Sequence, residues 1–254
     1  MKFGIADYGL FVWNGGLYDR EEMLLKLKEI GYNGVERIGA HSAADAIHKA
    51  GMFRRLGMDF STCRGPDIQA SIQWSAALGK EYVWLSLNDT SRKGDFDLYC
   101  RRANILTNSC KRWGIRAAVH NHLGQRIENQ RELEDFLTKC PDAGIVFDTG
   151  HLAAAGGNPV EIVKKYHERI CVMHLKDVFI KDENIGIDKW GKRLRFCELG
   201  GGNTDLDNMA VMKALVEVGY DGWVHVEHDT HLRDPYIDLK TSFDLLKDTG
   251  FTKK

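Results

Sequence analysis

Short apolar runs alternate with amphipathic stretches along the whole chain, and this alternation restricts the possible folds severely. Eight runs have the length and the β-branched or aromatic content of strands: 3–8, 34–38, 58–63, 82–87, 116–121, 144–149, 170–175 and 222–228. Stretches between them, such as DREEMLLKLKEI and LDNMAVMKALVEV, have the periodicity of helices. Gly31, Gly57 and Gly219 mark turns where helices give way to strands.

Eight strand–helix units without a break in composition predict one α/β domain over residues 1–254, a (β/α)8 TIM barrel. The length of 254 residues agrees with the roughly 250 that this barrel needs. A doubly wound sheet is the alternative, but the chain has no dinucleotide-binding fingerprint. The connection 176–205 exceeds the usual limit of about 12–15 residues for loops. We expect a lid over the site there, the alternative being a mobile surface excursion.

The charge balance argues against two classes of partner. Lys and Arg total 35 and Asp and Glu total 36, so the formal net charge is −1. A nearly neutral chain has no general attraction to nucleic acid or to an anionic membrane surface. We expect neither partner, no signal peptide and no membrane span. The six scattered cysteines show no CxxC pairing, so we expect reduced thiols and a cytoplasmic protein.

Four residues suited to metal binding end four successive predicted strands: His120, Asp148, His174 and Glu227. In a parallel barrel these ends meet at one rim, where carboxylates and imidazoles together can hold a divalent metal. Strand alternation turns their apolar neighbours, such as Val119 and Phe147, toward the helices and the four polar residues toward the barrel axis. The alternative is a set of rim residues that bind only each other and water.

The segments VHNHLG, GIVFDTGHLAAAGGNP, CVMHLKD and GYDGWVHVEHD resemble the xylose-isomerase-like barrel superfamily of sugar isomerases and epimerases, and within it the inosose dehydratases. The resemblance covers about half of the chain, mainly 116–230. It implies one divalent metal held by Asp148, His174 and Glu227. A glutamate commonly ends strand five in that superfamily; this chain has His120 there, and His122 is the alternative ligand. The stretch EHDTHLRDP departs from the pattern, so the substrate stays open.

The resemblance also implies the cofactor and the reaction. Mn²⁺ is the expected metal, with Co²⁺, Mg²⁺, Fe²⁺ and Zn²⁺ as alternatives. Enzymes of this kind stabilise an enediolate after a base removes the proton next to a ketone. Loss of a β-substituent then makes a lyase, whereas reprotonation makes an epimerase or isomerase. We expect a lyase that acts on a keto-cyclitol or a keto-sugar, including β-elimination from a 3-keto-glycoside, with isomerase or epimerase activity as the alternative.

Further residues receive roles in this scheme. His151, in the DTGH segment, matches a superfamily position that contacts substrate oxygen, and His122 or Glu36 could move the proton. Lys176 could neutralise a leaving oxygen or bind the substrate carbonyl; an ion pair with Glu36 or Asp177 is the alternative. The residues expected to contact the substrate are Trp13, Asn88 and Trp190.

Two functions of other classes compete with this prediction. A DNA-repair endonuclease shares the fold, but it needs more histidine ligands from early strands, and near-neutral charge argues against it. A non-catalytic sugar-binding barrel, acting as a subunit, is the other. The sequence leaves the oligomeric state open, so a homo-oligomer or an accessory subunit remains compatible with it.

Overall fold

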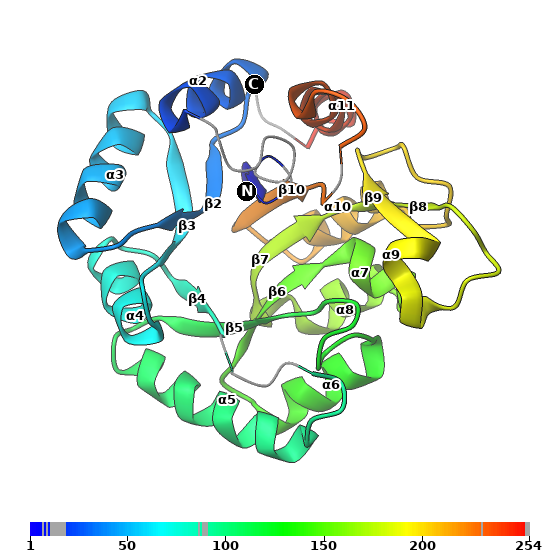
Figure 1. The fold of residues 1–254 in the computed structure, drawn as a ribbon, viewed down its shortest axis with the longest axis horizontal. Helices are drawn as coiled ribbons and strands as arrows, with labels where there is room; N and C mark the ends of the chain where they lie inside the picture. Colours follow the sequence, from blue (N-terminus) through cyan, green and yellow to red (C-terminus); the bar gives the residue numbers. More distant parts are fainter. Residues whose placement is uncertain are drawn as a thin grey trace.

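The structure is a computed structural model that describes residues 1–6, 8, 10, 19–85, 87, 91–229 and 231–251. Eight parallel strands form one sheet in the order β3-β2-β1-β10-β7-β6-β5-β4, and Figure 1 shows helices surrounding it. The strands are β1 (Lys2–Ala6), β2 (Gly34–Gly39), β3 (Asp59–Arg64), β4 (Tyr82–Trp84), β5 (Arg116–His120), β6 (Gly144–Asp148), β7 (Ile170–Leu175) and β10 (Trp223–Glu227). The outermost strands β3 and β4 approach each other where Thr62 Oγ1 donates to the Tyr82 carbonyl at 2.7 Å. The predicted α/β barrel fold is therefore confirmed.

Helices follow the strands in sequence and surround the barrel, except α9, which lies within the connection after β7. They are α2 (Arg20–Ile30), α3 (Ala43–Leu56), α4 (Ile68–Ala77), α5 (Phe96–Lys111), α6 (Gln130–Lys139), α7 (Thr149–Ala154), α8 (Pro159–Tyr166), α9 (Trp190–Arg193), α10 (Asn208–Glu217) and α11 (Pro235–Asp248), with short 3-10 turns at His167–Arg169 and Ile187–Lys189. Polar caps fix their starts: Asn129 and Glu132 form a capping box on α6, and Asp148 accepts from the His151 amide at the start of α7. No described helix is long and apolar enough to cross a membrane.

Strand alternation separates an outer core from the barrel interior. Val119, Phe147 and Met173 belong to the large apolar cluster shared with the helices. Ala118, Val146 and Val172 pack with Tyr82 in a second cluster inside the barrel. His120, Asp148 and His174 follow those inner residues by two positions, so they face the same interior at the carboxyl ends of the strands. The lower barrel is thus filled with apolar side chains, and the polar groups gather above them.

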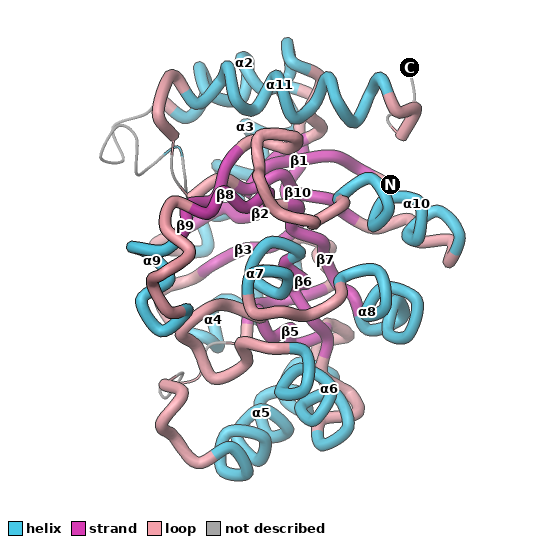
Figure 2. Tube along the Cα trace, turned by 90° about the vertical axis from the view of Figure 1, so that its right-hand side faces the viewer, coloured by secondary structure: helices cyan, strands magenta, loops and turns pink. Residues whose placement is uncertain are grey.

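The long connection after β7 is an ordered hairpin. Strands β8 (Asp177–Ile180) and β9 (Leu194–Cys197) pair antiparallel, with α9 between them. Val178, Leu194 and Phe196 are buried in an apolar cluster of their own with Leu123. Figure 2 shows this hairpin on one side of the strands, opposite the labelled amino terminus. The segment therefore has a core that anchors it to the barrel, which an irregular excursion would lack.

Candidate metal centre

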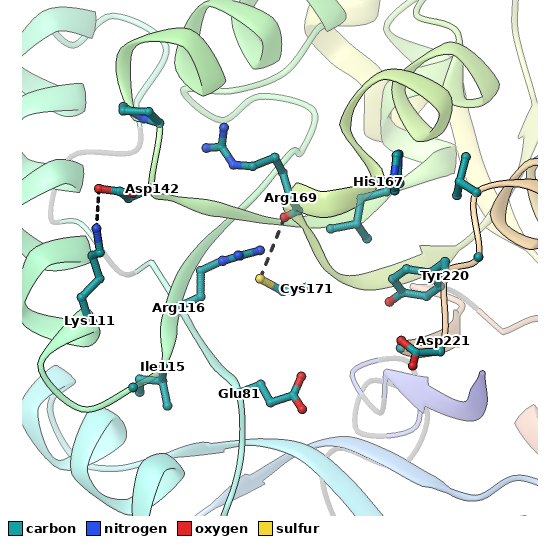
Figure 3. A pocket seen from close by; sticks show the side chains of 16 residues that line it. Glu81, Lys111, Ile115, Arg116, Asp142, His167, Arg169, Cys171, Tyr220 and Asp221 are labelled. Carbon is teal, nitrogen blue, oxygen red and sulfur yellow. Dashed lines mark hydrogen bonds and ion pairs between the residues drawn. The ribbon is translucent and has the colours of Figure 1, made fainter.

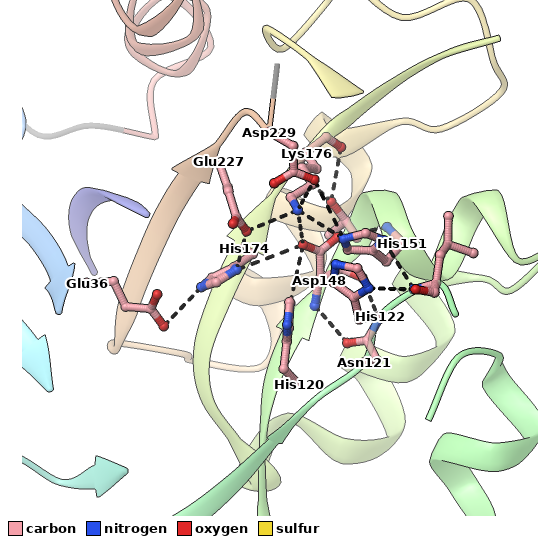
Figure 4. A network of polar contacts seen from close by, with 12 residues as sticks. Glu36, His120, Asn121, His122, Asp148, His151, His174, Lys176, Glu227 and Asp229 are labelled. Carbon is pink, nitrogen blue, oxygen red and sulfur yellow. Dashed lines mark hydrogen bonds and ion pairs between the residues drawn. The ribbon is translucent and has the colours of Figure 1, made fainter. Parts of the chain in front are cut away.

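The residues His120, Asp148, His174 and Glu227, here called the rim cluster, come together at the carboxyl ends of β5, β6, β7 and β10 (Figure 4). One candidate ligand atom from each lies within 4.8 Å of the other three. His174 Nδ1 is 2.6 Å from Glu227 Oε2, and His120 Nε2 is 3.6 Å from Asp148 Oδ2. The fold thus brings to one point four side chains that span more than 100 residues of sequence.

The facing polar atoms of the rim cluster lack regular hydrogen bonds among the described residues. Buried polar atoms are normally hydrogen-bonded, because leaving one unsatisfied costs about 1–3 kcal/mol. No regular hydrogen bond reaches four atoms, one from each residue, among the residues that the structure describes: His120 Nε2, Asp148 Oδ2, His174 Nδ1 and Glu227 Oε2. Their charged contacts are with one another and with the Lys176 ammonium. Two imidazole nitrogens and two carboxylate oxygens form a normal donor set for a divalent metal. The residues present therefore fit a divalent ion.

Glu36 lies beneath His174 and holds its ring. Glu36 Oε1 is 3.2 Å from His174 Nε2, on the side opposite the rim-cluster nitrogen, and accepts from Trp84 Nε1 at 2.8 Å. Burial raises the pKa of Glu36, but the charges of His174 and Arg37 outweigh burial and lower it to about 2. A carboxylate behind a ligating histidine fixes its orientation and tautomer. Glu36 is fully buried and does not line the cavity of about 880 Å³ described below, which favours a positioning role; its predicted role in proton transfer stays a prediction.

The electrostatics of the rim cluster favour positive charge. Burial lowers the pKa of His174, but Glu36 and Glu227 outweigh burial and raise it to about 10. Burial dominates at His120 instead and lowers its pKa below the ordinary value, which leaves a neutral ring able to act as a ligand. Carboxylates thus surround a position where a cation is stabilised.

His122 and His151 pack against each other, with tilted rings, beside the rim cluster. Their ring centroids lie 3.7 Å apart, and Trp190 from α9 contacts both rings, with centroids 5.8 and 6.0 Å away. His122 Nδ1 lies 2.7 Å from the Leu123 carbonyl, so it carries the proton and leaves Nε2 as an acceptor. Burial and the charge of neighbouring groups lower the pKa of His122 to about 4, and that of His151 falls well below its ordinary value. Both rings are therefore neutral at pH 7.

A cavity of about 880 Å³, here called the rim cavity, opens above these residues. Its lining includes Trp84, His120, His122, Trp190, Glu227 and Asp229. Of the four residues predicted to be catalytic, His122 lines this cavity, whereas Glu36, His151 and Lys176 are buried behind it. Trp190 lines the rim cavity, and its predicted contact with the substrate stays a prediction. Trp13 and Asn88 fall outside the described residues.

Comparison with known proteins places this geometry in a family. The profile of the family described as xylose isomerase-like TIM barrel matches residues 66–252, more than half of the chain. The chain belongs to this family. The curated relatives include an inosose dehydratase from Clostridium botulinum, 33% identical over 56% of this chain and 49% of its own length. Another inosose dehydratase, from Clostridium beijerinckii, is 26% identical over 74% of this chain and 63% of its own length. The chain thus spans about half to under two thirds of these relatives.

Solved structures of this barrel family share the fold across nearly the whole chain. A probable 3-DHS dehydratase from Bacillus anthracis superposes with a TM-score of 0.75 at 12% identity, covering 97% of this chain and 99% of its own. The IOLI protein, solved with a bound zinc atom, gives a TM-score of 0.68 at 19% identity and covers 98% and 96%. At such identities the likeness shows the barrel fold and nothing finer.

Sequence reasoning missed Asp229 and misjudged the partners of Lys176. Lys176 Nζ lies 3.0 Å from Asp229 Oδ2, 3.3 Å from Asp148 Oδ2 and 3.2 Å from Glu227 Oε2, rather than beside Glu36 or Asp177. Lys176 is 1% exposed, so a direct contact with substrate is not supported. Asp229 stands two positions beyond Glu227, and strand alternation was the available signal that the two share a face.

Histidines and an aspartate also gather at His228, His231 and Asp238. Asp238 Oδ2 faces His231 Nδ1 at 3.0 Å, and Asp238 Oδ1 accepts from Arg233 Nε at 2.6 Å. His228 Nε2 lies 3.2 Å from the Ser242 hydroxyl, and its Nδ1 has no hydrogen-bond partner among the described residues. Protein groups already bind both carboxylate oxygens of Asp238. These residues therefore connect the loop after β10 to α11.

Proposed function

We propose that this protein is a divalent-metal-dependent lyase that acts on a keto-cyclitol or keto-sugar, as an inosose dehydratase does or by β-elimination from a 3-keto-glycoside. The observation that carries the proposal is the convergence, beside the rim cavity, of four buried ligand atoms that have no regular hydrogen bond among the described residues. The curated relatives named inosose dehydratase support the lyase class. When bound, the metal supplies a Lewis acid that stabilises the enediolate formed on loss of the α-proton.

We propose His120, Asp148, His174 and Glu227 as the ligands and Mn²⁺ as the metal. Two carboxylates and two neutral imidazoles balance the charge of a divalent ion, whereas three carboxylates would leave the site negative. Imidazole suits iron, cobalt and zinc, and carboxylate suits manganese and magnesium, so the mixed set supports Mn²⁺ with Co²⁺, Fe²⁺, Zn²⁺ and Mg²⁺ as alternatives. His120 is preferred to His122 because its ring nitrogen joins the other three ligand atoms.

We propose that His122 moves the substrate proton. The Leu123 carbonyl holds its Nδ1 proton, so Nε2 carries the free lone pair, and the ring lines the rim cavity. His151 packs against His122, and its Nδ1 lies 3.3 Å from the Leu123 amide, so it positions the base. Trp190 from the hairpin covers both rings and supports a lid role for the connection 176–205.

The test is incubation of the Mn²⁺-loaded protein in D₂O with inosose, 3-keto-glucosides and ketohexoses, followed by proton NMR and mass spectrometry. A lyase gives an unsaturated product that has lost water or the glycosidic group. Deuterium at a new stereocentre without loss of mass would favour the isomerase or epimerase instead. The variant His122→Gln should lose turnover while it retains the metal, and the exposed His48→Gln on α3 serves as its control. No product from any of the three substrate classes would overturn the proposal.

We also propose a cytoplasmic location and a small-molecule sugar or cyclitol as the ligand. All six cysteines are free, which supports a reducing compartment. A homo-oligomer and a complex with an accessory subunit are the two assemblies that we propose to test. Sedimentation analysis of the purified protein measures the oligomeric state directly.

A further inference from the structure

The ammonium group of Lys176 sits in a pocket of metal-ligand atoms (Figure 4). Lys176 Nζ lies 3.0 Å from Asp229 Oδ2 and 3.0 Å from His151 Nε2. The carboxylate oxygens of Asp148 and Glu227 lie 3.3 and 3.2 Å from the same nitrogen. Three carboxylate oxygens and one imidazole nitrogen surround a single positive charge, and this donor set is one that a divalent metal also takes.

Two of these four groups also belong to the rim cluster. Oδ2 of Asp148 faces both the rim cluster and the Lys176 ammonium, and Oε2 of Glu227 does the same. Carboxylates shared between two cation positions are the bridging ligands of two-metal centres, whose ions lie about 3.5–4 Å apart. Asp229 and His151 are the groups that only the second position uses. The Lys176 nitrogen therefore stands where a second metal would stand.

The surroundings of Lys176 show that this placement is built into the fold. The Lys176 amide donates to Thr149 Oγ1 at 3.2 Å, and its carbonyl accepts from Asn208 Nδ2 at 3.0 Å, so the backbone is held on both sides. A Cβ on Gly150 would lie 2.5 Å from Lys176 Cβ, so only glycine leaves room for this side chain. The ring of Phe196 faces the ammonium at 4.6 Å.

We infer that Lys176 is a resident cation that occupies the position of a second divalent metal and limits the centre to one ion. The inference rests on the proposed function, because it requires one divalent ion at the rim cluster. The charges at the centre balance with one metal ion. Asp148, Glu227 and Asp229 supply three negative charges, and one divalent ion with one ammonium supplies three positive charges. A second divalent ion beside a retained ammonium would leave two surplus positive charges in a buried site, which is unfavourable.

The experiment counts metal ions in variants at this position. The wild type, Lys176→Ala, Lys176→Met and the double variant Lys176→Ala/Asp229→Asn are each dialysed against Mn²⁺ and analysed by plasma mass spectrometry. We expect one ion per chain in the wild type and two in Lys176→Ala, because removal of the ammonium opens the pocket. Lys176→Met keeps the volume filled and should hold one ion. The double variant loses a ligand used only at the second position and should return to one ion.

Electron paramagnetic resonance gives a second readout that is independent of activity. An isolated Mn²⁺ gives a six-line spectrum, whereas two bridged ions give a spin-coupled spectrum, which we expect for Lys176→Ala alone. One ion in a folded Lys176→Ala would overturn the inference. Two ions in the wild type would overturn it as well, whatever the folding of the variant. A wild type without bound Mn²⁺ would overturn the proposed function itself, so the two failures are distinguishable.

Discussion

A cavity lies at each end of the barrel. The charged side chains around the two cavities differ in their hydrogen-bond partners. The rim cavity measures about 880 Å³, and a second cavity of about 640 Å³, here called the basal cavity, lies at the amino ends of the strands (Figure 3). Lys111 pairs with Asp142 at 2.8 Å beside the basal cavity, and Arg169 donates to the backbone carbonyls of Ala143 and Cys140. At the rim, four buried ligand atoms have no regular hydrogen bond within the described part of the chain, and their charged contacts are with one another and with the buried Lys176.

The contrast shows what each end contributes. Cys140 is the C-cap residue of α6, so Arg169 satisfies carbonyls that a helix end leaves without partners. The charges at the basal cavity thus stabilise the connections between strands and helices. The rim instead gathers carboxylates and imidazoles whose facing atoms have no regular hydrogen bond among the described residues, which is typical of a site that a ligand completes. Substitutions at the two ends should therefore separate stability from metal binding and activity.

Asp148→Asn should have the largest effect. Asparagine can still cap α7, because the cap uses Oδ1, but the second oxygen no longer carries charge toward the rim cluster. A Lewis acid contributes several kcal/mol to such a transition state. Turnover should therefore fall at least about a thousandfold, since each 1.36 kcal/mol is tenfold. Asp142→Asn at the basal cavity is the control. If both variants lost the same turnover and the same metal content, the two ends of the barrel would not differ in function.

Glu36→Gln should weaken metal binding without abolishing it. Glutamine keeps a carbonyl oxygen for His174 Nε2 but removes the negative charge behind the ring. Loss of a carboxylate behind a ligating histidine typically costs about 10- to 100-fold in metal affinity. Competition with a fluorescent chelator measures the metal affinity. The variant Glu81→Gln at the basal cavity is the matched control. Unchanged Mn²⁺ affinity in Glu36→Gln would rule out its positioning role.

Arg169→Met should lower stability and leave the rim intact. The variant leaves the carbonyls of Ala143 and Cys140 without their guanidinium partner. Unsatisfied acceptors of this kind cost about 1–3 kcal/mol, which urea unfolding measures. Mn²⁺ stoichiometry should stay at the wild-type value, and a change in it would show that the two ends are coupled.

Trp190→Ala tests the hairpin as a cover for the rim cavity. Aromatic contacts of this geometry are worth about 0.5–1.5 kcal/mol, so KM should rise about two- to tenfold. The exposed Trp113 provides the control variant Trp113→Ala. If steady-state kinetics gave both variants the wild-type KM, Trp190 would have no role in substrate binding.

The smallest effect is expected from the thiol beside the basal cavity. Burial raises the pKa of Cys171 to about 11, so about one thiol in a thousand is ionised at pH 8. Iodoacetamide should label it slowly at that pH, as peptide mass mapping would show, and activity should be unchanged. Rapid labelling with loss of activity would make the basal cavity part of the functional site.

The sequence predicted the strands well, because their apolar content and their length are local properties. Strand β7 lies at the predicted positions, and the other ends differ by at most three residues. The rim cluster was also foreseeable, since parity and strand ends place His120, Asp148, His174 and Glu227 on one face and at one rim. The hairpin β8–β9 was missed because its pairing joins residues that lie between fourteen and twenty positions apart in the sequence.

By itself, then, the amino-acid order determined the barrel, the order of its strands and the side chains offered at its rim. Tertiary structure alone decided which of them meet: Glu36 behind His174, Lys176 among Asp148, Glu227 and Asp229, and His151 behind His122. The reason is physical. Periodicity fixes the direction in which a side chain leaves its strand, whereas hydrogen bonding and ion pairing depend on ångström distances between strands that only the closed barrel sets.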